Sequence, residues 1–301
     1  MGISQYIKEI GRGKQGARAL DRARAADLFA QVLDGAVTDL EIGAFCIAMR
    51  IKGETPEEMA GFLDATASRM QRASSRSGKP VVVLPSYNGA RRLPVLTPLL
   101  AALVARRGLP VLIHGTATES TRTTASDVLQ ALDVQPSPGA PRIDDGQVAY
   151  VPTEVLSPGL KRLLDVRKVV GLRNSAHSLV KLMNPCDGPA VIVSSYTHPE
   201  YAISMAAVFE LMGSTALLLR GTEGEAVADA RRLPQMEGFI RGHKTILQEG
   251  RKGTLTDLPD LPKEVDVQST AAYVRAVLAG HKPIPDSLAL QVEHILHLAD
   301  A

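Results

Sequence analysis

Tryptophan is absent from this 301-residue chain, and aromatic residues of every kind make up only 4% of it. The hydrophobic share of 45% must therefore come mainly from Leu, Val, Ile and Ala. Such a composition favours helices packed on a mostly buried sheet over an all-β sandwich. The shortage of rings also makes stacking a minor means of holding any ligand.

Cysteine is nearly absent too. The chain has two, Cys46 and Cys186, without the C-x-x-C spacing of a redox or zinc motif. This argues against a disulfide framework and against a zinc site, and predicts a reducing compartment. No run of about 18 apolar residues is present, and the amino-terminal residues lack a signal-peptide core. The sequence predicts a cytoplasmic protein with no membrane partner.

A strong net charge is also missing, because the balance is only +2. The distribution of charge is more informative than its sum. Any one basic pair has an ordinary explanation as part of a solvated, mixed-charge surface. Many such clusters in a chain of modest net charge predict at least one basic face. The clusters are Arg12/Lys14/Arg18, Arg22/Arg24, Arg91/Arg92, Arg106/Arg107, Lys161/Arg162, Arg167/Lys168, Arg231/Arg232 and Arg251/Lys252.

The first part of the chain has the apolar periodicity of helices. Residues 19–33 place apolar side chains on one helical face, and Gly35 follows as a stop. Thr38 or Asp39 caps the next helix, and Thr55 caps a third. Residues 1–72 are therefore predicted to be helical, and the polar segment 71–80 is predicted to be a linker.

From residue 81 the pattern changes to short β-rich runs that alternate with helical segments. This alternation predicts an α/β fold with a parallel sheet. Strands are expected at 81–84, 110–115, 148–152, 190–196 and 214–221, with a further candidate at 238–242. Helices are expected at 95–107, 125–133, 198–212 and 267–280.

The loop "PSYNGARR" at 85–92 separates a strand from a helix, where open α/β sheets commonly hold a phosphate. A phosphate cradle needs backbone N–H groups that no side chain obstructs. Pro85 has no N–H, Tyr87 brings a ring into that space, and Arg91 and Arg92 follow. The loop is a working phosphate site, a broken one, or a site for another anion.

Three further groups of residues are candidates for binding. His114 ends a predicted strand and precedes a hydroxyl-rich loop containing Arg122, which suits an anion or ordinary capping. Glu223 and Glu225 suit either a Mg²⁺ ion or a plain surface loop. The residues Arg167, Arg173, His177 and Lys181 are spaced by six, four and four, so the last three would share one helical face. That stripe contacts either phosphates or water.

Three ungapped segments carry a resemblance to a known family. They are residues 28–65, "IHGTATESTRTTASDVLQALDV" at 113–134 and "SPGLKRLLDVRKVVGLRNSAHSLVKLMNP" at 157–185. All three resemble anthranilate phosphoribosyltransferases, and the likeness extends over nearly the whole chain. It implies a small all-helical domain of residues 1–79, completed by about 158–186. It also implies a large α/β domain of residues 80–157 and 187–301 with a central, largely parallel sheet, and a homodimer formed through the helical domains.

The same resemblance implies a site for phosphoribosyl pyrophosphate and Mg²⁺, and this chain departs from it. The family's glycine loop corresponds to residues 85–89, and its acidic metal pair has at best Glu225 as a counterpart, with Glu223 nearby. Arg167 matches the arginine expected to meet an anthranilate carboxylate. Loss of one preorganised donor typically lowers a rate by roughly 100- to 1000-fold, which argues against anthranilate phosphoribosyltransferase activity. The former donor-site positions are Pro85, Ser86, Tyr87, Asn88, Gly89, His114, Gly115, Ser120 and Thr121.

The pattern of losses is similar to a branch of the family that keeps the fold and binds DNA or RNA without marked sequence preference. This implies a homodimeric protein that binds nucleic acid, single-stranded or non-specifically, with no catalytic residue and no cofactor. The alternative is a phosphoribosyl- or glycosyltransferase with an unknown acceptor, which would need Mg²⁺. A metabolite sensor or scaffold that uses the old acceptor pocket at Arg167 is a third hypothesis. The expected anion-binding residues are Arg91, Arg92, Arg122, Arg167, Arg173, His177 and Lys181.

Overall fold

The computed structural model describes residues 2–13 and 15–301, and within them the chain divides into two compact units. The helical unit consists of the residues up to Gln71 together with Thr153–Pro185, and the α/β unit consists of Arg72–Pro152 and Cys186–Ala301. The sequence placed these crossings at 79/80, 157/158 and 186/187, which differ from the divisions in the structure by eight, five and one residues. Among the described residues, no helix has the length and apolar character that crossing a bilayer requires.

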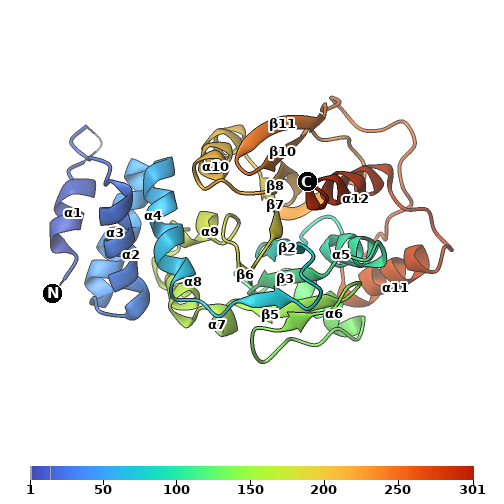
Figure 1. Ribbon diagram of the computed structural model, residues 1–301, viewed down its shortest axis with the longest axis horizontal. Helices are drawn as coiled ribbons and strands as arrows, with labels where there is room; N and C mark the ends of the chain where they lie inside the picture. The colour runs from blue at the N-terminus through green and yellow to red at the C-terminus, as the bar shows by residue number, and fades with distance from the viewer. Residues whose placement is uncertain (1, 14) are drawn as a thin grey trace. The chain divides into compact units, whose positions relative to one another are not determined.

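The helical unit has the fold class that its apolar periodicity predicts (Figure 1). Its second to fourth helices are capped by Asp21, Thr38 and Thr55, whose side chains each accept a hydrogen bond from a backbone N–H of the first turn. A buried aromatic cluster of Phe29 and Phe62, stacked at 4.5 Å, joins α2 to α4. The helices are α1 (Ser4–Ile10), α2 (Arg22–Asp34), α3 (Asp39–Lys52), α4 (Pro56–Ala67), α7 (Thr153–Leu156), α8 (Pro158–Val170) and α9 (Ala176–Leu179).

One expected feature of this unit is wrong. Arg173, His177 and Lys181 do not share a helical face, because α8 ends at Val170 and α9 is only one turn long. The side chain of Asn174 explains the break. Its Oδ1 accepts from the N–H of Ala176 while its Nδ2 donates to the carbonyl of Leu163. Such local bonds compete with helical ones.

The α/β unit is built on a large sheet with the order β11-β10-β8-β7-β2-β3-β5, and β9 pairs with β8. Strands β2, β3, β5, β7 and β8 are parallel, and β10 and β11 extend the sheet in the antiparallel sense. The strands are β2 (Val81–Ser86), β3 (Val111–Gly115), β5 (Val148–Pro152), β7 (Ala190–Tyr196), β8 (Ala216–Thr222), β9 (Glu225–Ala228), β10 (Met236–Ile240) and β11 (His243–Gln248).

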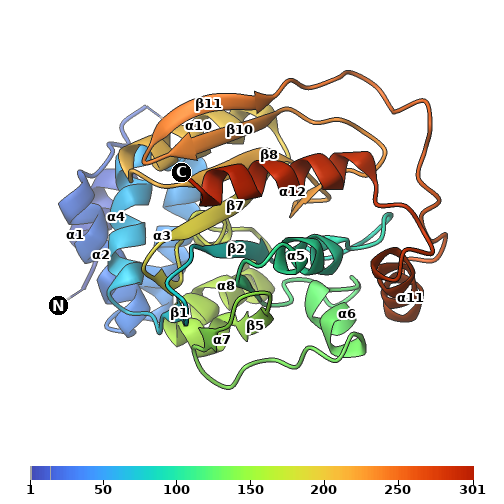
Figure 2. The ribbon, with the colours of Figure 1, turned by 45° about the vertical axis from the view of Figure 1, so that its right-hand side comes forward.

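A small parallel sheet in the same unit has the order β4-β1-β6, formed by β1 (Ala73–Ser75), β4 (Arg142–Ile143) and β6 (Cys186–Asp187). The predicted linker at 71–80 therefore contains a strand. The helices of this unit are α5 (Thr97–Arg106), α6 (Ala125–Ala131), α10 (Pro199–Leu211), α11 (Val267–Leu278) and α12 (Asp286–Ala299). Figure 2 shows α5 and α12 running along the sheet.

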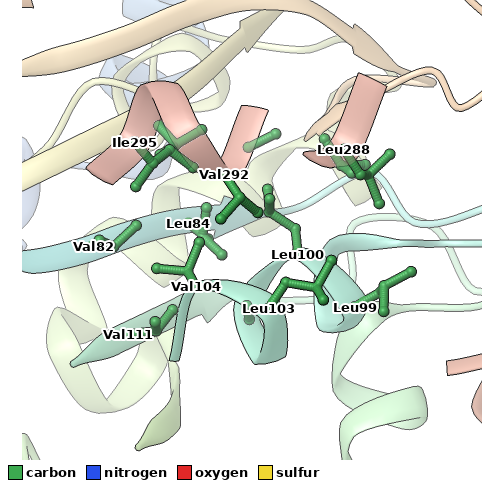
Figure 3. Close-up of a cluster of buried hydrophobic side chains, with 14 of the residues drawn as sticks. Val82, Leu84, Leu99, Leu100, Leu103, Val104, Val111, Leu288, Val292 and Ile295 are labelled. Carbon is green, nitrogen blue, oxygen red and sulfur yellow. The ribbon is translucent and has the colours of Figure 1, made fainter. Parts of the chain in front are cut away.

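The core of the α/β unit lies between the sheet and these two helices. Val82 and Leu84 of β2 meet Leu100 and Val104 of α5 and Val292 of α12 (Figure 3). Alternate residues of β2 belong to this cluster, as the two-residue period of a strand requires. The packing fixes the end of β2, and with it the loop that the sequence marked as a former phosphate site.

Candidate anion-binding site

The loop that follows β2 lies at the carboxyl edge of the parallel strands, the edge where ligands of such sheets bind. Residues 81–90 are all buried, whereas Arg91 and Arg92 are exposed. The close pairing of β2 with β3 depends on Gly115, because a Cβ there would lie 1.8 Å from the carbonyl oxygen of Ser86. The close approach of the two strands therefore requires a residue without a side chain at position 115.

A carboxylate of the protein itself occupies the loop. Glu225, at the start of β9, is 2% exposed. Its Oε1 accepts hydrogen bonds of 2.9 Å from the backbone N–H groups of both Asn88 and Gly89. Its Oε2 accepts from the hydroxyls of Ser86 and Thr97 at 2.5 and 3.0 Å. Backbone N–H groups and hydroxyls that suit a phosphate oxygen therefore bind a glutamate side chain.

Glu223 holds the next stretch of the loop in the same way. Its Oε2 accepts from the N–H groups of Arg91, Arg92 and Leu93 at 2.7, 3.0 and 3.3 Å. The residue has a φ of +52°, which the turn between β8 and β9 requires. Both acids that the sequence offered as a Mg²⁺ site thus face N–H and O–H donors. The carboxylate oxygens use their lone pairs to accept these hydrogen bonds. A cation would need the same lone pairs, so the arrangement does not fit one.

Tyr87 fills the space that a glycine would leave open. Its hydroxyl shares a 2.9 Å hydrogen bond with Nδ1 of His114, and the two rings meet edge to face. Both side chains are buried. Burial lowers the pKa of His114 to about 3, so its imidazole is neutral at neutral pH. The loop after β2 and the end of β3 therefore meet at an uncharged aromatic pair.

Arg122 also has a structural role. Its guanidinium binds the carboxylate of Glu119 at 2.9 Å and the carbonyl of Asn88 at 3.3 Å, and its side chain is 16% exposed. It therefore fastens the hydroxyl-rich loop to the loop after β2. Ser120 and Thr121, in the same hydroxyl-rich loop, are exposed.

The other expected anion-binding residues lie in the helical unit. Arg167, Arg173 and Lys181 are half-buried there. Burial, together with the positive charges of Arg173 and Arg167, lowers the pKa of His177 to about 4. The imidazole is therefore neutral at neutral pH, and the arginines supply the charge of this group. The predicted set is thus divided, with Arg91, Arg92 and Arg122 in the α/β unit.

Sequence reasoning did not identify the arginine pocket, a cavity of about 400 Å³ in the α/β unit. The pairs Arg91/Arg92 and Arg231/Arg232 were visible as basic clusters, but nothing in the sequence indicated that Arg92, Arg231 and Arg232 line one space. The pocket is lined by Arg92, Leu93, Arg220, Gly221, Thr222, Glu223, Asp229, Arg231 and Arg232.

Comparison with known proteins identifies relatives over most of the chain. Residues 4–70 match the helical bundle domain of a glycosyl transferase family. The chain is 40% identical over 298 residues to the uncharacterized protein YbiB of Escherichia coli (strain K12), covering 97% of this chain and 92% of YbiB. It is 33% identical over 273 residues to an anthranilate phosphoribosyltransferase of Methylobacterium radiotolerans, covering 88% of this chain and 78% of that enzyme.

Solved structures give the same fold. Anthranilate phosphoribosyltransferase from Thermus thermophilus superimposes with a TM-score of 0.78 at 22% identity, covering 98% of this chain and 89% of the other. The Saccharomyces cerevisiae enzyme, solved in complex with PRPP and Mg, superimposes with a TM-score of 0.68 at 14% identity, covering 99% and 88%. The helical unit and the α/β unit with its largely parallel sheet correspond to this architecture.

Proposed function

This chain belongs to the glycosyl transferase family of the anthranilate phosphoribosyltransferases, and we propose that it uses that fold to bind nucleic acid without sequence preference. One observation carries the proposal. The backbone donors of the former donor loop are bound to Glu225 and Glu223, while the neighbouring positive charge stands on exposed side chains of Arg91 and Arg92. Exposed guanidinium groups suit the phosphates of a polymer.

Further basic residues lie beside the arginine pocket, which Arg92 lines. The N–H of Arg251 donates to the carbonyl of Leu233, and the N–H of Leu255 donates to that of Arg231. These bonds hold Arg251 and Lys252, both exposed, alongside the wall of the arginine pocket. A row of side-chain charges of this kind attracts phosphates regardless of base identity. We propose the cytoplasm as the compartment and a single-stranded or otherwise non-specific nucleic acid as the partner.

Affinity for nucleic acid should fall steeply with salt. With about four neutralised phosphates, raising the salt from 50 to 200 mM should weaken binding by about 100-fold, since each contact releases counterions. Filter binding to DNA and RNA strands of unrelated sequence measures this, and the affinities for those sequences should agree. A flat response to salt, or no binding at 50 mM, would refute the proposal.

A second candidate is a phosphoribosyl- or glycosyltransferase, because the chain is 33% identical to a phosphoribosyltransferase. Calorimetry with phosphoribosyl pyrophosphate and Mg²⁺ separates the two. We expect no binding heat, since Glu225 and Tyr87 fill the donor loop. Micromolar binding would favour the transferase.

We also propose that the protein is a homodimer through its helical unit. On α3, Leu40, Ala44, Ile47 and Ile51 follow one face at helical spacing, and Leu40 and Ile51 are 83% and 63% exposed. An exposed apolar stripe of this kind marks an interface.

Leu40→Lys should therefore convert the dimer to a monomer, because each stripe would gain a charge that the interface cannot solvate. Size-exclusion chromatography with light scattering measures the mass. The matched control is Leu258→Lys, an exposed leucine of the α/β unit. A dimer that persists in Leu40→Lys, or a wild-type monomer, would contradict the assignment.

A further inference from the structure

The arginine pocket has the placement of a ligand site. Its walls come from the loop after β2 (Arg92, Leu93), the end of β8 (residues 220–223) and the segment after β9 (residues 229–232). Strand β8 is parallel to β7, and the pocket lies where β8 ends. This is the carboxyl edge of the parallel strands, where ligands of open α/β sheets bind.

The negative charges of the pocket are already engaged. Glu223 accepts from the backbone N–H groups of residues 91–93. Asp229 forms a two-pronged pair with Arg231, with distances of 3.0 and 2.9 Å. Burial raises the pKa of Asp229, and the bonds and charges of Arg231 and Arg232 lower it by more, so this carboxylate is ionised at neutral pH.

Two of the four guanidinium groups remain available. Within residues 2–13 and 15–301, the side chains of Arg92 and Arg220 have no hydrogen-bond or ion-pair partner, and both residues are exposed. Four arginines against two carboxylates leave the lining with two positive charges in excess. An excess of this size matches a phosphate monoester, which carries a charge of about −1.5 to −2 at pH 7. Guanidinium groups also match the geometry of phosphate oxygens.

Size and composition define the rest of the ligand. A volume of about 400 Å³ lies within the roughly 300–1,000 Å³ typical of small-molecule sites, and so exceeds the needs of a lone phosphate. Thr222 also lines this space; its hydroxyl donates to the carbonyl of Val227 at 3.0 Å, and its lone pairs can accept from a sugar hydroxyl. None of the described residues that line the pocket is aromatic, so a base would not be recognised by stacking.

We propose that the arginine pocket binds a phosphate monoester carried on a sugar, without regard to any base. The ligand is either the terminal phosphate of a nucleic-acid strand or a free sugar phosphate. The first source rests on the proposed nucleic-acid binding, and the second does not. Arg220 and Arg92 contact the phosphate, and the Arg231–Asp229 pair holds the part of the wall that follows β9.

The experiment compares ligands that differ only in the monoester. Fluorescence anisotropy is measured with oligonucleotides of one sequence carrying a 5′-phosphate, a 3′-phosphate or no terminal phosphate. Calorimetry compares ribose 5-phosphate with ribose. The test variant is Arg220→Gln, and Arg142→Gln, an exposed arginine outside the pocket, is the matched control. Thermal melts establish that both variants are folded.

We expect a phosphorylated end, or ribose 5-phosphate, to bind at least about 10-fold more tightly than its unphosphorylated partner, the usual effect of a charged hydrogen-bond partner. Arg220→Gln should abolish this preference and Arg142→Gln should keep it. The preference should weaken at pH 5, where the monoester loses its second charge.

The outcomes separate the two proposals. Binding of ribose 5-phosphate without binding of any oligonucleotide supports the pocket with a free sugar phosphate, and refutes nucleic-acid binding. Equal affinity for all three oligonucleotides, with no binding of ribose 5-phosphate, overturns the pocket and leaves nucleic-acid binding standing. A preference that survives Arg220→Gln unchanged also overturns the assignment to this pocket.

Discussion

Replacing Glu225 with alanine should lower the free energy of unfolding of the α/β unit by about 3–5 kcal/mol. The substitution leaves two backbone N–H groups and two hydroxyls, all in buried surroundings, without their acceptor. Each unsatisfied buried donor costs about 1–3 kcal/mol. The expected loss is smaller than the sum of these four costs, because the hydroxyls of Ser86 and Thr97 can rotate toward other acceptors. The costs of adjacent groups are also not additive.

Urea denaturation followed by circular dichroism measures this loss. Glu225→Gln should lose about half as much, because its amide oxygen still accepts from the N–H groups of Asn88 and Gly89. Glu249→Ala is the control at an exposed position and should change stability by no more than about 0.5 kcal/mol. A loss below about 1 kcal/mol in Glu225→Ala would mean that the loop does not depend on this carboxylate.

The same variant tests whether the carboxylate takes the place of a phosphate. Without it, the N–H groups of Asn88 and Gly89 become available to an added anion. Inorganic phosphate should then raise the melting temperature of Glu225→Ala more than that of the wild type, because a ligand bound only by the native state stabilises by mass action. Equal shifts would show that phosphate acts elsewhere. Slower hydrogen exchange in residues 85–93 of the variant would locate the binding.

The fold class was predictable because the α/β unit has strong local signals. Apolar runs bounded by glycine or proline predicted all of the longer parallel strands and the helices α5, α6, α10 and α11, with differences of at most two residues at their ends. The strands missed were β1, β4, β6, β9 and β11. Several of these have only two to four residues, too few for a two-residue period to appear. Strands β1, β4 and β6 form because partners distant in sequence complete their hydrogen bonds, whereas β9 and β11 pair with the strand just before them.

The site was predictable in position but not in content. Pro85 and Tyr87 marked the loop after β2 as a changed phosphate site, which required only local reasoning. The occupant could not be predicted, because Glu225 reaches Asn88 across 137 residues of sequence. It is placed there because β9 folds back on β8 and because β7 alone separates β8 from β2 in the sheet, an order that no local pattern indicates. The arginine pocket was not predicted for the same reason, because its arginines come from three separate segments of the chain.

Acidification from pH 6.5 to 4.5 should destabilise both units, by about 2–3 kcal/mol in the α/β unit and about 2 kcal/mol in the helical unit. The pKa of His114 is about 3 and that of His177 about 4, both below the ordinary value of 6.5. Below pH 6.5 the unfolded chain therefore takes up protons that the native state does not. Stability is full above pH 6.5 and is lost as pH falls, at about 1.4 kcal/mol per pH unit for each histidine.

Urea denaturation at pH 7.0, 6.0, 5.0 and 4.5 tests this expectation. His114→Gln and His177→Gln should each be less stable than the wild type at pH 7, because a buried group is replaced. Each should also show a smaller loss on acidification, because one titrating group is gone. His281→Gln, at an exposed position, is the matched control. If His114→Gln and the control show the same pH dependence, His114 does not titrate as its burial requires.

The two neutral histidines should not make the binding of an anion depend on pH. Because His114 and His177 are uncharged at neutral pH, neither adds to the attraction for an anion. That attraction comes from arginines, which do not titrate in proteins. The affinity for a nucleic acid without terminal phosphates should therefore stay constant between pH 6 and 8, while remaining sensitive to salt. A rise in affinity between pH 8 and 6 would assign the binding to a protonated histidine instead of to the arginines.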